Sequence, residues 1–165
     1  MQITRVMVVV AIGAGFTSSS RPHASLSTQS ATTHMMVDPS GLEWRPLPRE
    51  WTEGAPPPGF DPVGQTDVAI VSGDPSREGA PYVIRLRSTP GTRLPVHWHP
   101  NDEHITVLSG TWCVGMGDRF DERACRDMPA GSYVFVPKGS RHFAVARGNV
   151  VQIHGIGPFK AVFVK

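Results

Sequence analysis

The last two-thirds of the chain is a series of short apolar runs, each four to six residues long, in which β-branched and aromatic residues recur. Glycine- and proline-rich segments such as 73–75, 90–91 and 129–131 separate these runs and are typical of turns. Many short strands at even spacing favour a sandwich or a barrel over an α/β sheet. We therefore predict an all-β fold with strands at 68–71, 82–86, 94–99, 104–108, 111–116, 132–136, 142–146, 150–154 and 161–164.

The alternation of side chains along a strand assigns neighbouring residues to opposite faces. If Glu103 points into the interior of the fold, Ile105, Val107 and Ser109 share its face. His104 then points away from the interior, and we do not expect it to contact the same groups as Glu103.

The composition fits one globular domain of 165 residues, with 39% hydrophobic and 18% charged residues. The formal net charge is only +2, and the basic residues are scattered among acidic ones rather than clustered. A nucleic-acid partner is therefore not expected. We predict one β-barrel domain over residues 41–165.

The amino terminus has the pattern of a signal peptide. Arg5 leads into an apolar run of 11 residues, 6–16, and small residues follow at 17–20. The run is too short to span a bilayer, and no cysteine follows it for lipid attachment. We predict a signal peptide at 1–20, a flexible linker at 21–40 and export to the periplasm or medium, without a stable membrane anchor. A mis-set start codon or a disordered tail is the alternative.

The two cysteines, Cys113 and Cys125, would close a loop of 13 residues if they were bonded. An exported protein could keep such a bond. The sequence leaves open whether they are bonded or are two free thiols, because Cys125 lies in a segment, 121–127, that we expect to be a short helical connection. Their spacing is not that of a zinc finger.

Three histidines and one glutamate form the candidate metal site. His97 and His99 are two positions apart, so on a strand their side chains leave the same face, with Cα atoms about 6.6 Å apart. A turn signal at 100–102 precedes Glu103, and a second one at 137–140 precedes His142. One fold can bring all four groups to one point, and together they suit a borderline transition metal.

Two segments resemble conserved motifs of the cupin superfamily. Residues 91–103, Gly-Thr-Arg-Leu-Pro-Val-His-Trp-His-Pro-Asn-Asp-Glu, followed by Gly110, resemble the first motif at every position. Residues 131–142, Gly-Ser-Tyr-Val-Phe-Val-Pro-Lys-Gly-Ser-Arg-His, are similar to the second motif. This sequence departs from that motif only at the motif's last position, where Ala146 stands in place of an asparagine. The resemblance, with its motif core at 91–142, implies a double-stranded β-helix, or jelly roll, whose interior holds a metal through three histidines and one glutamate.

The resemblance does not imply one reaction, because cupins include dioxygenases, lyases, isomerases, sensors and storage proteins. Our first hypothesis is a metal-dependent enzyme, dioxygenase-like or another oxidoreductase, that acts on a small oxygenated organic compound. The alternative is a non-catalytic cupin that binds or senses a metal or a small ligand. Fe, Mn, Ni, Cu and Zn all accept the donor set as divalent ions. By family analogy we also expect a homodimer.

His154 is the candidate catalytic residue outside the metal site. An inward-facing imidazole near the metal would suit proton transfer, because it titrates near neutrality. The sequence leaves two alternatives, since either Gln152 and His154 or Val151 and Ile153 face the interior. In the second case His154 is a rim or surface residue.

Overall fold

Short β-branched and aromatic runs form the strands of this structure, a computed structural model that describes residues 35–164. The predicted signal peptide at 1–20 and most of the predicted linker lie outside the described residues. Among the described residues, no helix is long and apolar enough to cross a membrane. The elements are η1 (Pro39–Gly41), β1 (Arg45–Pro46), η2 (Arg49–Trp51), β2 (Thr52–Glu53), β3 (Thr66–Gly73), β4 (Pro81–Ser88), β5 (Arg93–Trp98), β6 (Glu103–Met116), β7 (Arg126–Pro129), β8 (Tyr133–Val136), β9 (His142–Ile156) and β10 (Ala161–Phe163).

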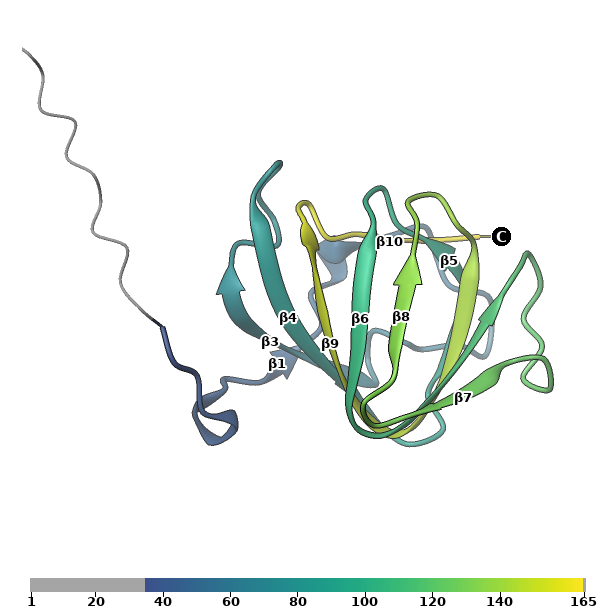
Figure 1. The fold of residues 1–165 in the computed structure, drawn as a ribbon. Coiled ribbons are helices and arrows are strands. Elements are labelled where there is room, and N and C mark those ends of the chain that lie inside the picture. Colours follow the sequence, from purple (N-terminus) through teal and green to yellow (C-terminus); the bar gives the residue numbers. More distant parts are fainter. Residues whose placement is uncertain (1–34, 165) are drawn as a thin grey trace, which may run out of the picture. The chain divides into compact units, whose positions relative to one another are not determined.

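The strands form one curled, almost entirely antiparallel sheet. Its main path runs β1-β3-β4-β9-β5-β10-β2, and β6 joins it by pairing with β9, β8 and β7. Figure 1 shows the strands curling around a common interior, with β4, β9, β6 and β8 side by side. The prediction of an all-β jelly-roll barrel is confirmed.

The two longest strands each combine two predicted ones. β6 continues from 103 to 116 through register shifts on either side of Ser109, at Leu108 and Gly110, and β9 continues from 142 to 156. Gly110 has a φ of +65°, and a side chain there would collide with the carbonyl of Gly148 on β9. The glycine therefore lets the strand bulge and continue against its partner where a turn was expected.

The segment expected to be helical, 121–127, is instead a turn followed by a strand, so that prediction is wrong. Residues 122–124 form the turn, and Arg126 and Asp127 already belong to β7, which pairs with β6. Pairing with the edge of β6 satisfies the backbone of this segment, which a short isolated helix would not achieve as well.

The interior is apolar and follows the predicted alternation. Glu103, Ile105 and Val107 are buried on one face of β6, while His104 is only half-buried. Ser109 was expected on the buried face, but it is exposed because the register shifts there. Facing strands supply the remaining core, and each buried valine or isoleucine stabilises the fold by roughly 1.5–3 kcal/mol. They include Val68, Ile84, Val134, Val136, Val151 and Ile153.

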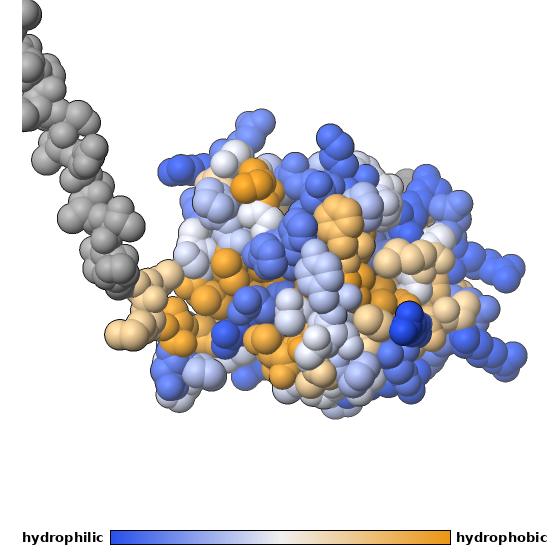
Figure 2. All heavy atoms as spheres, viewed as in Figure 1, coloured by the Kyte–Doolittle hydropathy of each residue, from blue (hydrophilic) through white to orange (hydrophobic). Residues whose placement is uncertain are grey.

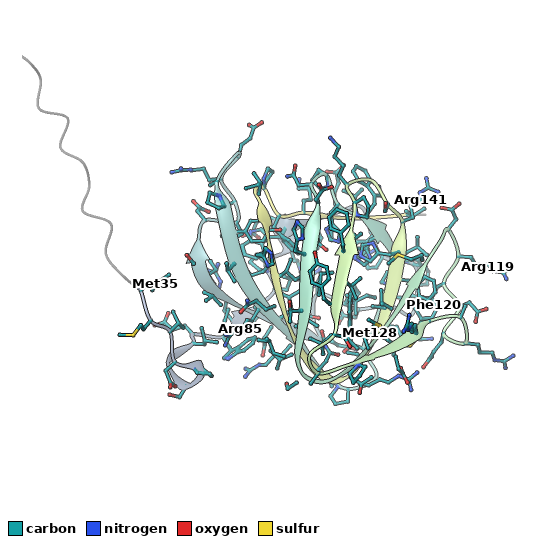
Figure 3. The ribbon with its side chains drawn as sticks, in the orientation of Figure 1. Met35, Arg85, Arg119, Phe120, Met128 and Arg141 are labelled. Carbon is teal, nitrogen blue, oxygen red and sulfur yellow. A yellow bond between two sulfur atoms is a disulfide. The ribbon has the colours of Figure 1, made fainter. Side chains whose placement is uncertain are left out.

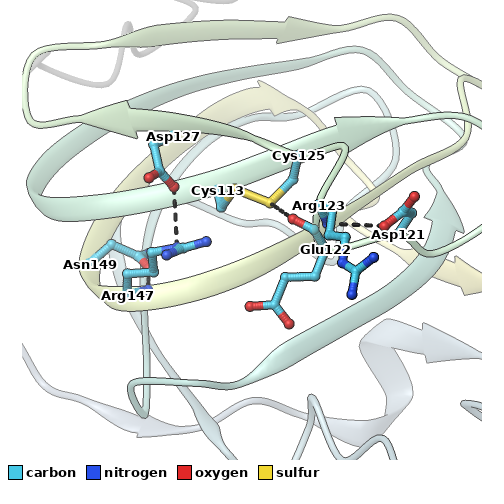
Figure 4. Close-up of a disulfide and its surroundings, with 8 residues drawn as sticks. All are labelled: Cys113, Asp121, Glu122, Arg123, Cys125, Asp127, Arg147 and Asn149. Atoms are coloured by element: carbon cyan, nitrogen blue, oxygen red, sulfur yellow. Dashed lines mark hydrogen bonds and ion pairs between the residues drawn. A yellow bond between two sulfur atoms is a disulfide. The ribbon is translucent and has the colours of Figure 1, made fainter.

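A disulfide joins Cys113 on β6 to Cys125, the residue directly before β7, which settles the alternative that the sequence left open (Figure 4). The two Cα atoms are 5.5 Å apart, a usual separation for such a bond. Phe120, on the loop between β6 and β7, packs against the ring of Phe143 at a centroid distance of 5.1 Å (Figure 3). The bond thus fastens a surface loop to the barrel, and by chain entropy it contributes about 3 kcal/mol of stability.

Candidate metal centre

The three histidines predicted as metal ligands lie together at one end of the barrel interior. His97 is near the end of β5, His99 follows two positions later, and His142 starts β9 directly opposite His97. All three are buried, and one ring nitrogen from each lies within 4.8 Å of the others. The alternation along β5 and the pairing of β5 with β9 therefore produce the predicted cluster.

Glu103, at the first position of β6, lies beside His99 but outside the group of three imidazoles whose ring nitrogens are within 4.8 Å of one another. Its Oε2 atom lies 3.2 Å from Nε2 of His99, and its side chain is buried. Its Oε1 atom is the only buried side-chain nitrogen or oxygen of the described residues without a hydrogen-bond partner. A buried carboxylate oxygen without a partner is costly, and a cation would satisfy it.

Backbone carbonyls orient all three imidazoles. Nδ1 of His97 lies 2.7 Å from the carbonyl oxygen of Pro95, and Nδ1 of His99 lies 2.7 Å from that of Lys160. Nδ1 of His142 lies 3.2 Å from the carbonyl oxygen of Ser140. A carbonyl only accepts, so each Nδ1 carries the hydrogen and each Nε2 keeps its lone pair, which in His99 lies beside Oε2 of Glu103. This is the arrangement that metal-binding histidines adopt.

Burial keeps the cluster uncharged when no ion is bound. It lowers the pKa of His97 well below 6.5, lowers that of His99 to about 3 with a further contribution from His142, and also lowers the pKa of His142. Burial raises the pKa of Glu103 from 4.5 to about 8. At neutral pH the carboxyl of Glu103 therefore keeps its proton, which it can donate to Nε2 of His99.

The cluster lines a cavity of about 60 Å³ in the barrel. Apart from the four site residues the wall is mainly apolar, with a few uncharged polar side chains. It includes Leu86, Leu94, Ile105, Trp112, Val151, Ile153, Phe159 and Phe163, together with Thr66, Ser88 and Asn149.

His154 does not belong to this site, so its predicted role as a catalytic residue is not supported. Val151 and Ile153 are buried and line the cavity, whereas His154 is exposed on the opposite face of β9. The physical reason is that the two apolar residues take the interior positions. His154 instead stacks on the ring of His104 outside the barrel.

Sequence reasoning missed the groups that support the ligands. The carbonyls of Pro95 and Ser140 each lie two residues before the histidine that they orient, so this local contact follows from the strand ends. The carbonyl of Lys160 is 61 positions from His99, and no sequence signal identifies it. The ring of Phe159, 5.7 Å from that of His99, was also not predicted.

The chain's fold is similar to that of the polyketide cyclase RemF from Streptomyces resistomycificus, with 15% identity over 81% of this chain and 88% of that chain and a TM-score of 0.58. It is also similar to the DMSP lyase DddQ from Ruegeria pomeroyi DSS-3, with 18% identity over 76% and 62% and a TM-score of 0.56. An RmlC-like cupin from Shewanella frigidimarina shares 16% identity over 76% and 93%, with a TM-score of 0.51.

At these identities the similarity shows the fold alone. A search of curated protein sequences finds no match to the chain. The family model described as the ChrR Cupin-like domain matches residues 74–160, a segment that contains all four residues of the cluster. The resemblance to the cupin superfamily is thereby confirmed, and the chain belongs to the family of ChrR cupin-like domains.

Proposed function

We propose that the protein holds one divalent transition metal through His97, His99, Glu103 and His142, and that it is a metal-dependent enzyme of the oxidoreductase or dioxygenase-like kind. The observation that carries the proposal is the close approach of three buried imidazoles. One ring nitrogen from each of the three histidines lies within 4.8 Å of the others, and Glu103, with its unpartnered Oε1 atom, lies beside His99 in the same buried region. Fe, Mn, Ni, Cu and Zn each suit these donors.

The cavity supports a small oxygenated organic compound as the substrate. A metal held by three histidines and one carboxylate acts as a Lewis acid that favours an oxygen donor from the substrate. The apolar wall excludes water and leaves little room, while Thr66, Ser88 and Asn149 offer hydrogen bonds without charge. Thr66 and Ser88 already share one hydrogen bond, at 2.8 Å between their hydroxyl oxygens, so one of these hydroxyls keeps a free donor.

A second candidate function is non-catalytic binding of a metal or a small ligand. It is favoured by the absence of any further titratable side chain along the cavity wall within residues 35–164. An enzyme at this site would have to use Glu103 or the metal itself for proton transfer, because Tyr82, His104 and His154 do not line the cavity.

Azide added to Co(II)-loaded protein separates the two functions. A catalytic site needs an exchangeable coordination position, so we expect azide to shift the visible absorption bands of the ion. His97→Ala protein treated in the same way should show no such bands. Absorption bands that azide does not shift would favour the non-catalytic binding function. Oxygen consumption in a screen of small oxygenated compounds would then test the enzyme directly.

We further propose that residues 1–20 are a signal peptide removed on export. The disulfide supports this proposal, since such bonds persist in oxidising compartments and are rare in the cytosol. Amino-terminal sequencing of natively expressed protein should begin after the small residues at 17–20. A natural amino terminus at Met1 or Gln2 would contradict export by this route. Homodimer formation stays a prediction.

A further inference from the structure

A second cluster of imidazoles lies on the outer face of the barrel. His104 on β6 is paired directly with His154 on β9 and with Phe135 on β8. His154 and Tyr133 are exposed, and His104 is half-buried beside them. β8, β6 and β9 are adjacent in Figure 1, and Figure 2 shows that hydrophilic and hydrophobic residues mix on the face viewed there.

The two histidines are neighbours on the outer face of the sheet. Directly opposed residues of an antiparallel sheet have side chains that leave it side by side. The ring centroids of His104 and His154 are 4.9 Å apart, and the ring planes differ by 7°. The rings of the buried cluster are 4.2–5.1 Å apart and inclined to one another by 38–87°, whereas the outer rings stack nearly parallel. Because an ion lies in the plane of each imidazole that binds it, the exposed ring of His154 must turn out of the stack to share an ion with His104.

A hydroxyl group orients one ring of the pair. Nδ1 of His104 lies 2.6 Å from the hydroxyl oxygen of Tyr133. When Nδ1 donates its hydrogen to that oxygen, Nε2 of His104 keeps a lone pair for an ion, as it does in the buried histidines. His104 also borders a shallow hollow that is lined by Asp102 and Lys138, whose side chains carry opposite charges.

One ion cannot serve both clusters. Glu103 and His104 are consecutive on β6, so their side chains leave opposite faces of the sheet. The buried group lies in the apolar interior, and the outer pair is open to water. The two sites therefore differ in access, in donor number and in charge.

We propose that His104 and His154 form a second, solvent-exposed site for a borderline divalent ion such as Cu(II), Ni(II) or Zn(II). Two imidazoles supply the protein donors, and water completes the coordination. Because it has two protein donors instead of four, this site binds more weakly than the buried one and exchanges its ion freely. Among these ions Cu(II) binds most tightly, as the general order of divalent affinities requires.

Titration of Cu(II) into full-length protein whose buried site has already been loaded and quantified tests this proposal. We expect one further equivalent, with an electron paramagnetic resonance spectrum that shows two coordinated imidazole nitrogens. His104→Ala and His154→Ala should each weaken this binding at least tenfold and remove one nitrogen from the spectrum. The metal content of the buried site should stay unchanged, which also shows that both variants are folded.

His34→Ala is the matched control, because it removes a histidine of the amino-terminal region. It should leave the second equivalent unaltered. The proposal is overturned if both barrel variants bind the second equivalent as the wild type does, or if only the control loses it. These outcomes do not depend on whether the buried site is catalytic.

Discussion

His97→Ala protein is expected to contain less than a tenth of the metal that the wild-type protein retains after gel filtration. The substitution removes one of four donors and leaves a gap in a site whose remaining imidazoles are held in place by backbone carbonyls. Glu103→Gln should have a similar effect, because it keeps the shape of the side chain but removes the charge that balances the ion. Elemental analysis of the purified proteins measures both.

Thr106→Ala is the matched control for these variants. Thr106 lies three positions after Glu103 on β6, is half-buried and is not among the residues that line the cavity. Its substitution should leave the metal content unchanged. Wild-type stoichiometry in both the His97→Ala and Glu103→Gln proteins would show that these residues are not the ligands.

Removal of the metal is expected to lower the melting temperature, and to lower it more at pH 8 than at pH 6.5. The reason lies in Glu103, whose pKa is about 8 in the folded metal-free protein and 4.5 without burial. Between these values the folded state binds a proton that the unfolded state has lost. The stability that this proton confers is present below pH 4.5 and is lost as the pH rises through 8, by up to about 1.4 kcal/mol per pH unit.

The histidines act in the opposite direction at lower pH. Their folded pKa values lie below 6.5, so the unfolded state binds more protons there, and the metal-free protein loses stability as the pH falls below 6.5. Metal-free protein should thus be most stable near pH 6.5. A bound ion keeps Glu103 ionised and removes the loss on the alkaline side, and it adds stability by binding only the folded state.

Differential scanning fluorimetry of metal-loaded and chelated protein at pH 5, 6.5 and 8 measures these effects. Metal-free Glu103→Gln protein is the informative control, because it lacks the ionising group and should show no decline between pH 6.5 and 8. Equal melting temperatures of the loaded and chelated wild-type protein at each pH would contradict the assignment of the site.

Most of the correct predictions came from the alternation of side chains along the strands. His97 and His99 share a face because they are two positions apart, and burial of Glu103 with Ile105 followed from the same rule. Strand ends were less predictable, because the Gly110 bulge continues a strand where glycine suggested a turn. His154 was left undecided because its face depends on the register between β9 and β6, which only long-range pairing fixes.

The carbonyls of Pro95, Ser140 and Lys160 belong to the main chain, so the hydrogen bonds that orient the imidazoles do not depend on particular outer side chains. Substitutions at 140 and 160 that preserve the backbone should leave the ligand geometry intact. The backbone of the fold therefore determines how the three imidazoles are oriented. Under the proposed function, a change in the compound accepted would arise through residues of the cavity wall, such as Ser88 or Asn149, while the proposed ligands stay in place.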